Sequence, residues 1–215
     1  MEIIYLTLGT AITSTILGWL LGILTPAIVK KIAENKEKEN LEKIIFNDIQ
    51  ELKKRLAPLS FRVYPKYGRL DQETFDWLKA NSGIDFSDGL EQLEQEGHTE
   101  EQMLAYLNER GLQDNTHSYF KKMHLFATDS HLMNFGLIDN ELMANILEVR
   151  FHVEAFNEDV ESFREHLKMT FLPGITPENH RIVSQEIVNK SMTIAEKSMF
   201  IVDKINAIVS SREGS

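Results

Sequence analysis

The fold is decided by residues 139–169, which read DNELMANILEVRFHVEAFNEDVESFREHLKM, and by a second run over 177–211. In the first run, apolar residues recur in alternating steps of four and three: Leu142, Ile146, Val149, Val153, Phe156, Val160, Phe163 and Leu167. This spacing places them on one face of an α-helix and is typical of the buried seam of a helical bundle. We therefore predict an all-α fold built on this helix, with Asp139 as its N-cap.

The second run forms the partner of the first. Leu172-Pro173-Gly174 interrupts the helical pattern, and Thr176 followed by Pro177 is a helix-start signal. The apolar face of the helix predicted over 177–211 reads Val183, Ile187, Ser191, Ile194, Ser198, Ile201, Ile205 and Ile208. A connection this short makes the two helices antiparallel neighbours.

Two further helices complete a predicted bundle of three to four long helices, whose core spans 115–211. One covers about 116–135, with Phe120 and Met123 on its apolar face. The other covers 30–57 and ends at Pro58, because proline cannot continue a helix interior. The first half of this helix is rich in Glu and Lys and reads as a solvated stalk. Its second half has an apolar seam made of Leu41, Ile45, Ile49, Leu52 and Leu56.

An acidic helical insertion is predicted over 71–114. It holds twelve acidic residues against only Lys79 and Arg110, so it accounts for the formal net charge of −10 of the whole chain. Thr99 and Gln102 have the spacing of a capping box. Because strongly apolar residues are few here, we expect a mobile or loosely packed subdomain. Its predicted helices cover 72–80, 88–95 and 100–110; a basic, aromatic linker (58–70) precedes it, and the chain ends in a disordered tail (212–215).

Residues 1–29 are predicted to be a transmembrane anchor. No charged side chain occurs from Ile3 to Val29, and Lys30-Lys31 follows at once. A helix needs about 20 apolar residues to cross a bilayer. Residues 3–24 contain eleven Ile or Leu residues, which favour insertion by about 3–6 kcal/mol. A cleaved signal peptide is the alternative, but it requires basic residues before the apolar run, and none is present.

The charges beside the anchor predict its orientation. The first basic residues, Lys30, Lys31 and Lys36, all follow the span. By the positive-inside rule, the N-terminus lies outside and the C-terminal domain lies in the cytoplasm, so we expect a single-pass protein of the cell (inner) membrane. The lipid bilayer is one expected partner. An acidic chain is a poor match for nucleic acid, which is not expected to bind.

Small residues recur every four positions within the predicted span, at Thr10, Ser14, Gly18 and Gly22. Such a stripe lets two membrane helices approach closely, and Gly18 with Gly22 forms a GxxxG. The stripe predicts self-association of the anchor and therefore a homo-oligomer. The alternative is chance, because small residues are common in membrane helices.

Histidines recur every seven residues at His117, His124 and His131, and His152 and His166 flank Asp159 with the same spacing. Facing stripes of this kind are candidates for a metal site or a proton switch. However, seven residues rise about 10.5 Å along a helix, whereas ligands of one metal lie three or four residues apart. The interpretation that we favour is polar side chains beside a core seam, so we predict no metal and no cofactor.

One basic segment, 61–69, is interleaved with aromatic residues. Its cations are Arg62, Lys66 and Arg69, which are candidates for contact with an anion or a partner. The alternative is a linker whose aromatic residues pack on the bundle while its cations meet the acidic insertion.

No catalytic motif is present: the chain has no glycine-rich phosphate loop, no nucleophile elbow and no HExxH, and it has no cysteine. We therefore predict a membrane-anchored scaffold or interaction protein that binds a protein partner. A second hypothesis is a membrane-acting effector, such as a toxin or defence component, that oligomerises through its transmembrane helix. A third is an enzyme or metal-binding bundle that uses histidines from different helices.

Overall fold

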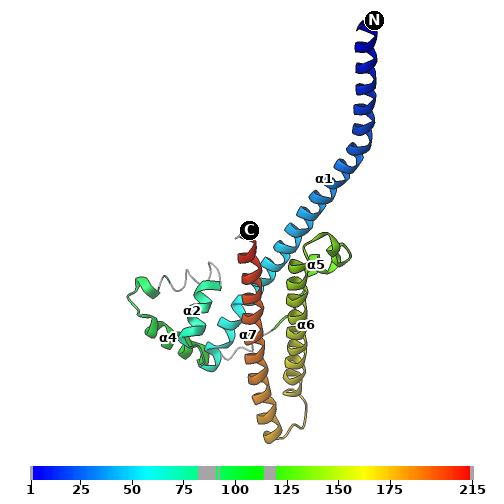
Figure 1. Ribbon diagram of the computed structural model, residues 1–215. Helices are drawn as coiled ribbons and strands as arrows, with labels where there is room; N and C mark the ends of the chain where they lie inside the picture. The colour runs from blue at the N-terminus through cyan, green and yellow to red at the C-terminus, as the bar shows by residue number, and fades with distance from the viewer. Residues whose placement is uncertain (1, 82–90, 92, 114–119, 214–215) are drawn as a thin grey trace.

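A computed structural model shows an all-helical protein (Figure 1). It describes the backbone of residues 2–81, 91, 93–113 and 120–213. It describes the side chains of the same residues except 2–18, 20, 21, 23, 24, 27, 113, 132–134 and 213. Within this described part, every regular element is an α-helix or a 3-10 helix. The predicted all-α class and the helical bundle are therefore confirmed.

The first element, α1, is one helix from Glu2 to Val63 with Pro26 and Pro58 inside it. The prediction that Pro58 ends this helix is wrong. Proline removes a hydrogen bond and costs a helix interior about 3 kcal/mol. The turn that follows buries Leu59 and Val63, which are 6% and 0% exposed, and burying a side chain of this size contributes about 1.5–3 kcal/mol. Packing on the bundle therefore outweighs the defect at Pro58.

The predicted anchor lies in the N-terminal part of α1. Among the residues that the structure describes with their side chains, no helix has both the length and the apolar composition that a membrane span requires. Most of the uncharged run, including all of residues 3–18, lies outside those side chains. The anchor thus remains a prediction from the sequence.

Two long helices, α6 (Asn140–Met169) and α7 (Pro177–Glu213), form an antiparallel hairpin (Figure 1). The Asp139 carboxylate accepts a hydrogen bond from the backbone N–H of Glu141 at 2.8 Å, so the predicted N-cap is confirmed. The Thr176 hydroxyl accepts one from the N–H of Asn179 at 3.3 Å. Gly174 allows the tight connection, because its φ of +84° is a conformation that other residues rarely adopt.

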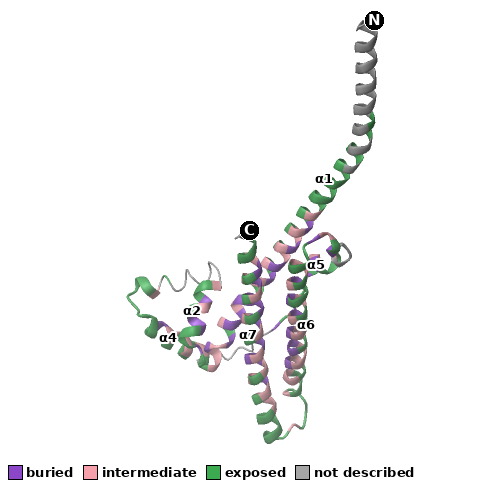
Figure 2. Cartoon of the chain, in the orientation of Figure 1, coloured by how far each residue is buried: buried purple, intermediate pink, exposed green. Residues whose placement is uncertain are grey.

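The main core lies between α7 and its two neighbours. Helix α7 packs against α6 and also against the second half of α1 (Figure 2). The predicted seams of α1, α6 and α7 are confirmed as buried over most of their length. The fully buried seam residues are Ile146, Phe156 and Val160 of α6, Ser191, Ile194, Ser198, Ile201 and Ile205 of α7, and Ile45, Ile49 and Leu56 of α1.

The helix predicted over 116–135 is not formed as one continuous helix in its described part, 120–135. Residues 120–125 have no helical structure, and only two short helices follow: α5 (Phe126–Ser130) and the 3-10 helix η2 (Leu132–Leu137). The side chain of Asn157 replaces the missing helical bonds. It accepts from the backbone N–H of Met123 and donates to the Met123 carbonyl, both at 2.7 Å. The extended chain then buries Phe120, whose ring meets that of Phe163 edge-on at 4.8 Å.

The acidic insertion has a small core of its own, so the expectation of loose packing is wrong for its described part. It contains α2 (Gln72–Asn81) and α4 (Glu100–Gln113), which follow the 3-10 helix η1 (Pro65–Tyr67). Half of the predicted helix 88–95 lies outside the described residues, and the described residues 91 and 93–95 are helical. The Thr99–Gln102 capping box is confirmed by reciprocal bonds of 2.8 and 3.3 Å. The side chains of this core are Leu70, Phe75, Leu78 and Met103.

Helix α4 approaches η1 so closely that only glycine fits at position 111. A Cβ there would lie 2.3 Å from the carbonyl carbon of Pro65, and backbone cannot turn aside as a side chain can. We expect Gly111→Ala to destabilise this contact by about 1–3 kcal/mol. Amide hydrogen exchange should then become faster in α4 while α6 is unchanged.

Gly136→Ala is the control for this prediction, because no atom lies within 4 Å of the position that its Cβ would take. Unchanged exchange in α4 of the Gly111→Ala variant would show that the close approach does not hold the insertion in place.

Candidate functional site

The structure does not bring the histidines together as one site. His124 precedes α5 and His131 follows it, while His152 and His166 lie on α6. His117 lies outside the described residues. In the described part of the chain, no three His, Asp or Glu side chains are arranged to hold a metal ion. In the described residues, His124 lies in a non-helical stretch, so His124 and His131 do not share one helix face.

The histidines of α6 have local partners instead. The His152 ring lies edge-on to the rings of Phe151 and Phe200, with centres 5.5 and 4.7 Å apart. Its Nε2 is 3.8 Å from Glu148. The Nδ1 of His166 is 2.7 Å from the carbonyl oxygen of Ser162, one turn earlier. These contacts match the interpretation of polar side chains beside a core seam.

Asp159, between these two histidines in sequence, is the buried charge of the hairpin at 9% exposure. It accepts a hydrogen bond from Lys190 at 3.1 Å and forms an ion pair with Lys197, so it joins α6 to α7. Burial alone would raise the pKa of the Asp159 carboxyl. The bonds from the two lysines outweigh burial and hold this pKa below its usual range.

We expect Asp159→Asn to destabilise the protein by about 1–3 kcal/mol at pH 7, because it removes charge-assisted hydrogen bonds from a mostly buried site. A carboxyl whose folded pKa is lowered stabilises the protein above its unfolded pKa of about 3.9, and this contribution disappears as the pH falls through the folded value. The difference between native and variant chains should therefore shrink at pH 3. Urea unfolding of the full chain at both pH values measures it.

The matched control is Glu158→Gln, at the exposed neighbouring position, for which the described residues provide no ion pair. A loss of stability in Asp159→Asn that is as large at pH 3 as at pH 7 would contradict the ionic role of Asp159.

The basic segment is built into the fold rather than left as a linker. Arg62 lies in the last turn of α1, Lys66 in η1, and Arg69 just beyond it; Arg62 and Arg69 are exposed. The Nζ of Lys66 is buried and has no hydrogen-bond partner in the described part of the chain. The Tyr67 hydroxyl donates to Ser191 of α7 at 3.3 Å. Tyr64 and Tyr67 therefore pack on the bundle core, as the alternative interpretation expects of the aromatic residues.

The small-residue stripe is described at one position only. The side chains of Thr10, Ser14 and Gly18 lie outside the described residues. Gly22 is exposed, and no atom lies within 4 Å of the position that a Cβ would take there. Contacts among the described residues therefore do not require a glycine at position 22. Self-association through the stripe stays a prediction.

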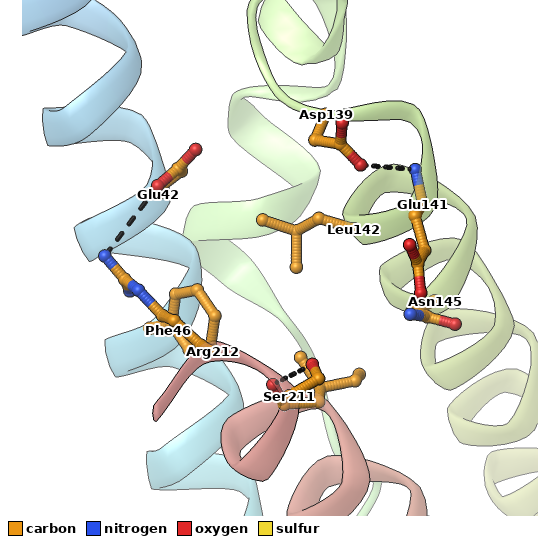
Figure 3. Close-up of a pocket in the computed structure, with 9 residues that line it drawn as sticks. Glu42, Phe46, Asp139, Glu141, Leu142, Asn145, Ser211 and Arg212 are labelled. Carbon is orange, nitrogen blue, oxygen red and sulfur yellow. Dashed lines mark hydrogen bonds and ion pairs between the residues drawn. The ribbon is translucent and has the colours of Figure 1, made fainter. Parts of the chain in front are cut away.

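A cavity of about 380 Å³ lies where three helices meet at the end of the hairpin nearest the stalk (Figure 3). The second half of α1 forms one wall, the first turns of α6 form another, and the C-terminal end of α7 closes the space. The lining residues are Glu42, Phe46, Asp139, Glu141, Leu142, Asn145, Ile208, Ser211 and Arg212. The cavity thus combines an apolar floor with a polar, mainly acidic rim.

One cation already occupies part of this rim. The Arg212 guanidinium carbon lies 4.1 Å from the centre of the Phe46 ring, which is a cation–π arrangement. A guanidinium nitrogen is 3.7 Å from the Glu42 carboxylate. Lys38 approaches the other oxygen of Glu42, also at 3.7 Å. On the opposite wall, the Asp139 carboxylate is engaged in capping α6 (Figure 3).

Sequence reasoning missed this cavity. It placed Glu42 near the end of a solvated stalk and Arg212 in a disordered tail. Helix α7 in fact continues to Glu213, so the tail prediction is wrong for Arg212, while residues 214 and 215 lie outside the description. The two residues that pair are 170 positions apart, and no local spacing pattern indicates such a contact.

Exposed apolar side chains mark two other surfaces. Phe151 and Phe200 lie on the outer side of the hairpin beside His152. Phe171 and Leu172 project from the turn between α6 and α7, with Phe171 74% exposed. Large apolar side chains that are grouped on a surface are typical of contact sites.

Comparison with known proteins provides no relative to guide the assignment. The chain matches no protein-family model, no curated protein and no solved structure. Its function therefore has to be inferred from its own residues.

Proposed function

We propose that this chain is a single-pass membrane protein whose cytoplasmic helical bundle acts as a scaffold for a protein partner. The observation that carries the proposal is the continuity of α1 from an uncharged run into the bundle core. The helix begins at Glu2, inside the predicted anchor, and runs without a break to Val63. One helix thus joins the predicted membrane segment to the folded domain.

The middle of α1 has the properties of a spacer. The described side chains of α1 before Leu41 are exposed, apart from the half-buried Lys38. Leu41 is the first buried residue that is described, and the core continues from it. At 1.5 Å per residue, the distance from Leu24 to Leu41 is about 25 Å. The bundle would therefore stand clear of the lipid headgroups.

Charge supports the proposed orientation. Lys30 and Lys31 directly follow the uncharged run and are both exposed. Cytoplasmic flanks of membrane helices carry such an excess of Lys and Arg. An N-terminus outside and a bundle in the cytoplasm follow from this asymmetry.

The interaction role is supported by the surfaces of the bundle. The described residues offer exposed aromatic side chains, an acidic insertion and one mainly acidic cavity. Such an arrangement suits binding to a partner.

We expect the full chain to stay in the membrane pellet after carbonate extraction and to leave it when Leu17→Arg and Leu20→Arg are combined. Each arginine near the centre of a span costs about 2.5–3.5 kcal/mol, so two cancel the estimated gain of about 3–6 kcal/mol from the apolar run. Leu112→Arg with Leu172→Arg is the matched control, because both leucines are exposed and lie outside the run. Release of the native chain by carbonate would contradict the anchor.

The same membranes test the scaffold role after gentle solubilisation and affinity purification. We expect one protein at a fixed molar ratio to the native chain. Stoichiometric metal, or turnover of a substrate by the purified protein, would contradict the scaffold role.

A further inference from the structure

We infer that the cavity between α1, α6 and α7 receives an arginine side chain of the partner protein, and that Arg212 partly fills this site as an internal stand-in. The inference rests on the proposed scaffold function, since it names the chemistry by which a partner binds. Three features of the cavity support this inference: an aromatic face, a carboxylate with no cation within hydrogen-bond distance, and a net negative rim.

The aromatic face comes from Phe46. Its ring already has a guanidinium 4.1 Å from its centre, so the geometry for stacking of a planar cation exists. Arginine is favoured over lysine at such a site, because its flat, weakly hydrated head group stacks on rings. The Arg212 side chain is 49% exposed and comes from the last turn of α7, so it can move aside.

The carboxylate with no cation within hydrogen-bond distance is that of Glu42. Its side chain is only 19% exposed, yet its two cations, Lys38 and Arg212, both stand 3.7 Å away. These distances exceed that of a hydrogen bond, whereas a charge-assisted N–H···O bond measures about 2.7–2.9 Å. Glu42 is therefore a half-buried acceptor whose two cations stand beyond hydrogen-bond distance, and a closer guanidinium would form a shorter, charge-assisted bond with it. A guanidinium that enters along the cavity can provide this bond, and can do so with two N–H groups.

The rim selects a cation over an anion. Three carboxylates, Glu42, Asp139 and Glu141, line the space together with one cation, Arg212. Lys38 pairs with Glu42 from outside the lining, so the charge around the space is still negative. Leu142 and Ile208 also line the space, and they suit the methylene stem of an arginine. Leu142 of α6 lies between Glu42 of α1 on one side and Glu141 and Asn145 on the other (Figure 3). A long side chain with a charged, planar tip matches this arrangement.

The test uses the full chain in detergent and a blocked tripeptide, acetyl-Gly-Arg-Gly-amide, as the probe, with binding measured by calorimetry or NMR titration. Removing the internal competitor with Arg212→Ala should raise the affinity for the probe at least about five-fold, because a tethered side chain competes at millimolar effective concentration. Adding Glu42→Gln to that variant should lower the affinity at least about ten-fold, since the charge-assisted bonds are lost. Helical circular dichroism and the melting temperature confirm that both variants are folded.

The control probes contain lysine or the uncharged citrulline in place of arginine. Equal affinity for the arginine and citrulline probes would overturn the inference, and so would equal affinity of Arg212→Ala with and without Glu42→Gln. No detectable binding of the arginine probe to Arg212→Ala at 10 mM, a concentration that reveals even millimolar affinity, would also overturn it. If free arginine amide binds as tightly as the tripeptide, the site belongs to a small molecule and the partner assignment is wrong.

This measurement needs neither a membrane nor a native partner. Its failure would leave the carbonate extraction and the purified complex unaffected. Conversely, a chain that carbonate releases from the membrane and that has no stable partner could still bind the probe. The outcome of one test therefore does not decide the outcome of the other.

Discussion

Burial of α7 on two sides is the constraint on which the rest of the structure depends. Helix α7 packs against α6 along one side and against the second half of α1 along another. Ile194, Ile201 and Ile205 are fully buried there, and each side chain of this size contributes about 1.5–3 kcal/mol. The hydroxyls of Ser191 and Ser198 lie in the same seam and donate to backbone carbonyls of their own helix, so they cost little to bury. The positions of α1 and α6 are thus set mainly through α7, and the cavity lies where the three helices meet.

Side-chain amides hold the irregular segments onto this frame. Backbone groups that leave a helix must find other partners when they are buried. Asn157 satisfies both backbone groups of Met123, and Asn108 does the same for Leu70, with bonds of 3.0 and 2.9 Å. Each amide fixes an extended stretch beside a helix. The segment 120–125 and the end of the linker at Leu70 are therefore held in place without being helical.

The features that could be predicted from the sequence are those that depend on interactions between residues close together in the chain. The seams of α6 and α7 and the caps at Asp139 and Thr176 depend on residues within a few positions of one another, so the sequence predicts them. The break in the helix predicted over 116–135 depends on Asn157, which lies 34 positions from Met123. The continuation of α1 past Pro58 depends on tertiary burial of the following turn. The cavity depends on the contact between Glu42 and Arg212, which are far apart in the sequence, and the spacing of residues along the chain does not predict such a contact.

The central claim is that α1 carries the bundle into the cytoplasm from a membrane span. Since the chain contains no cysteine, single cysteines can report its topology. We would place one at Glu2 and, in a second variant, one at Ser210, which is exposed on α7, and treat intact spheroplasts with a membrane-impermeant maleimide. The account predicts that the Glu2→Cys variant is labelled in intact spheroplasts and the Ser210→Cys variant only after lysis. Labelling of Ser210→Cys before lysis, or protection of Glu2→Cys until lysis, would contradict it.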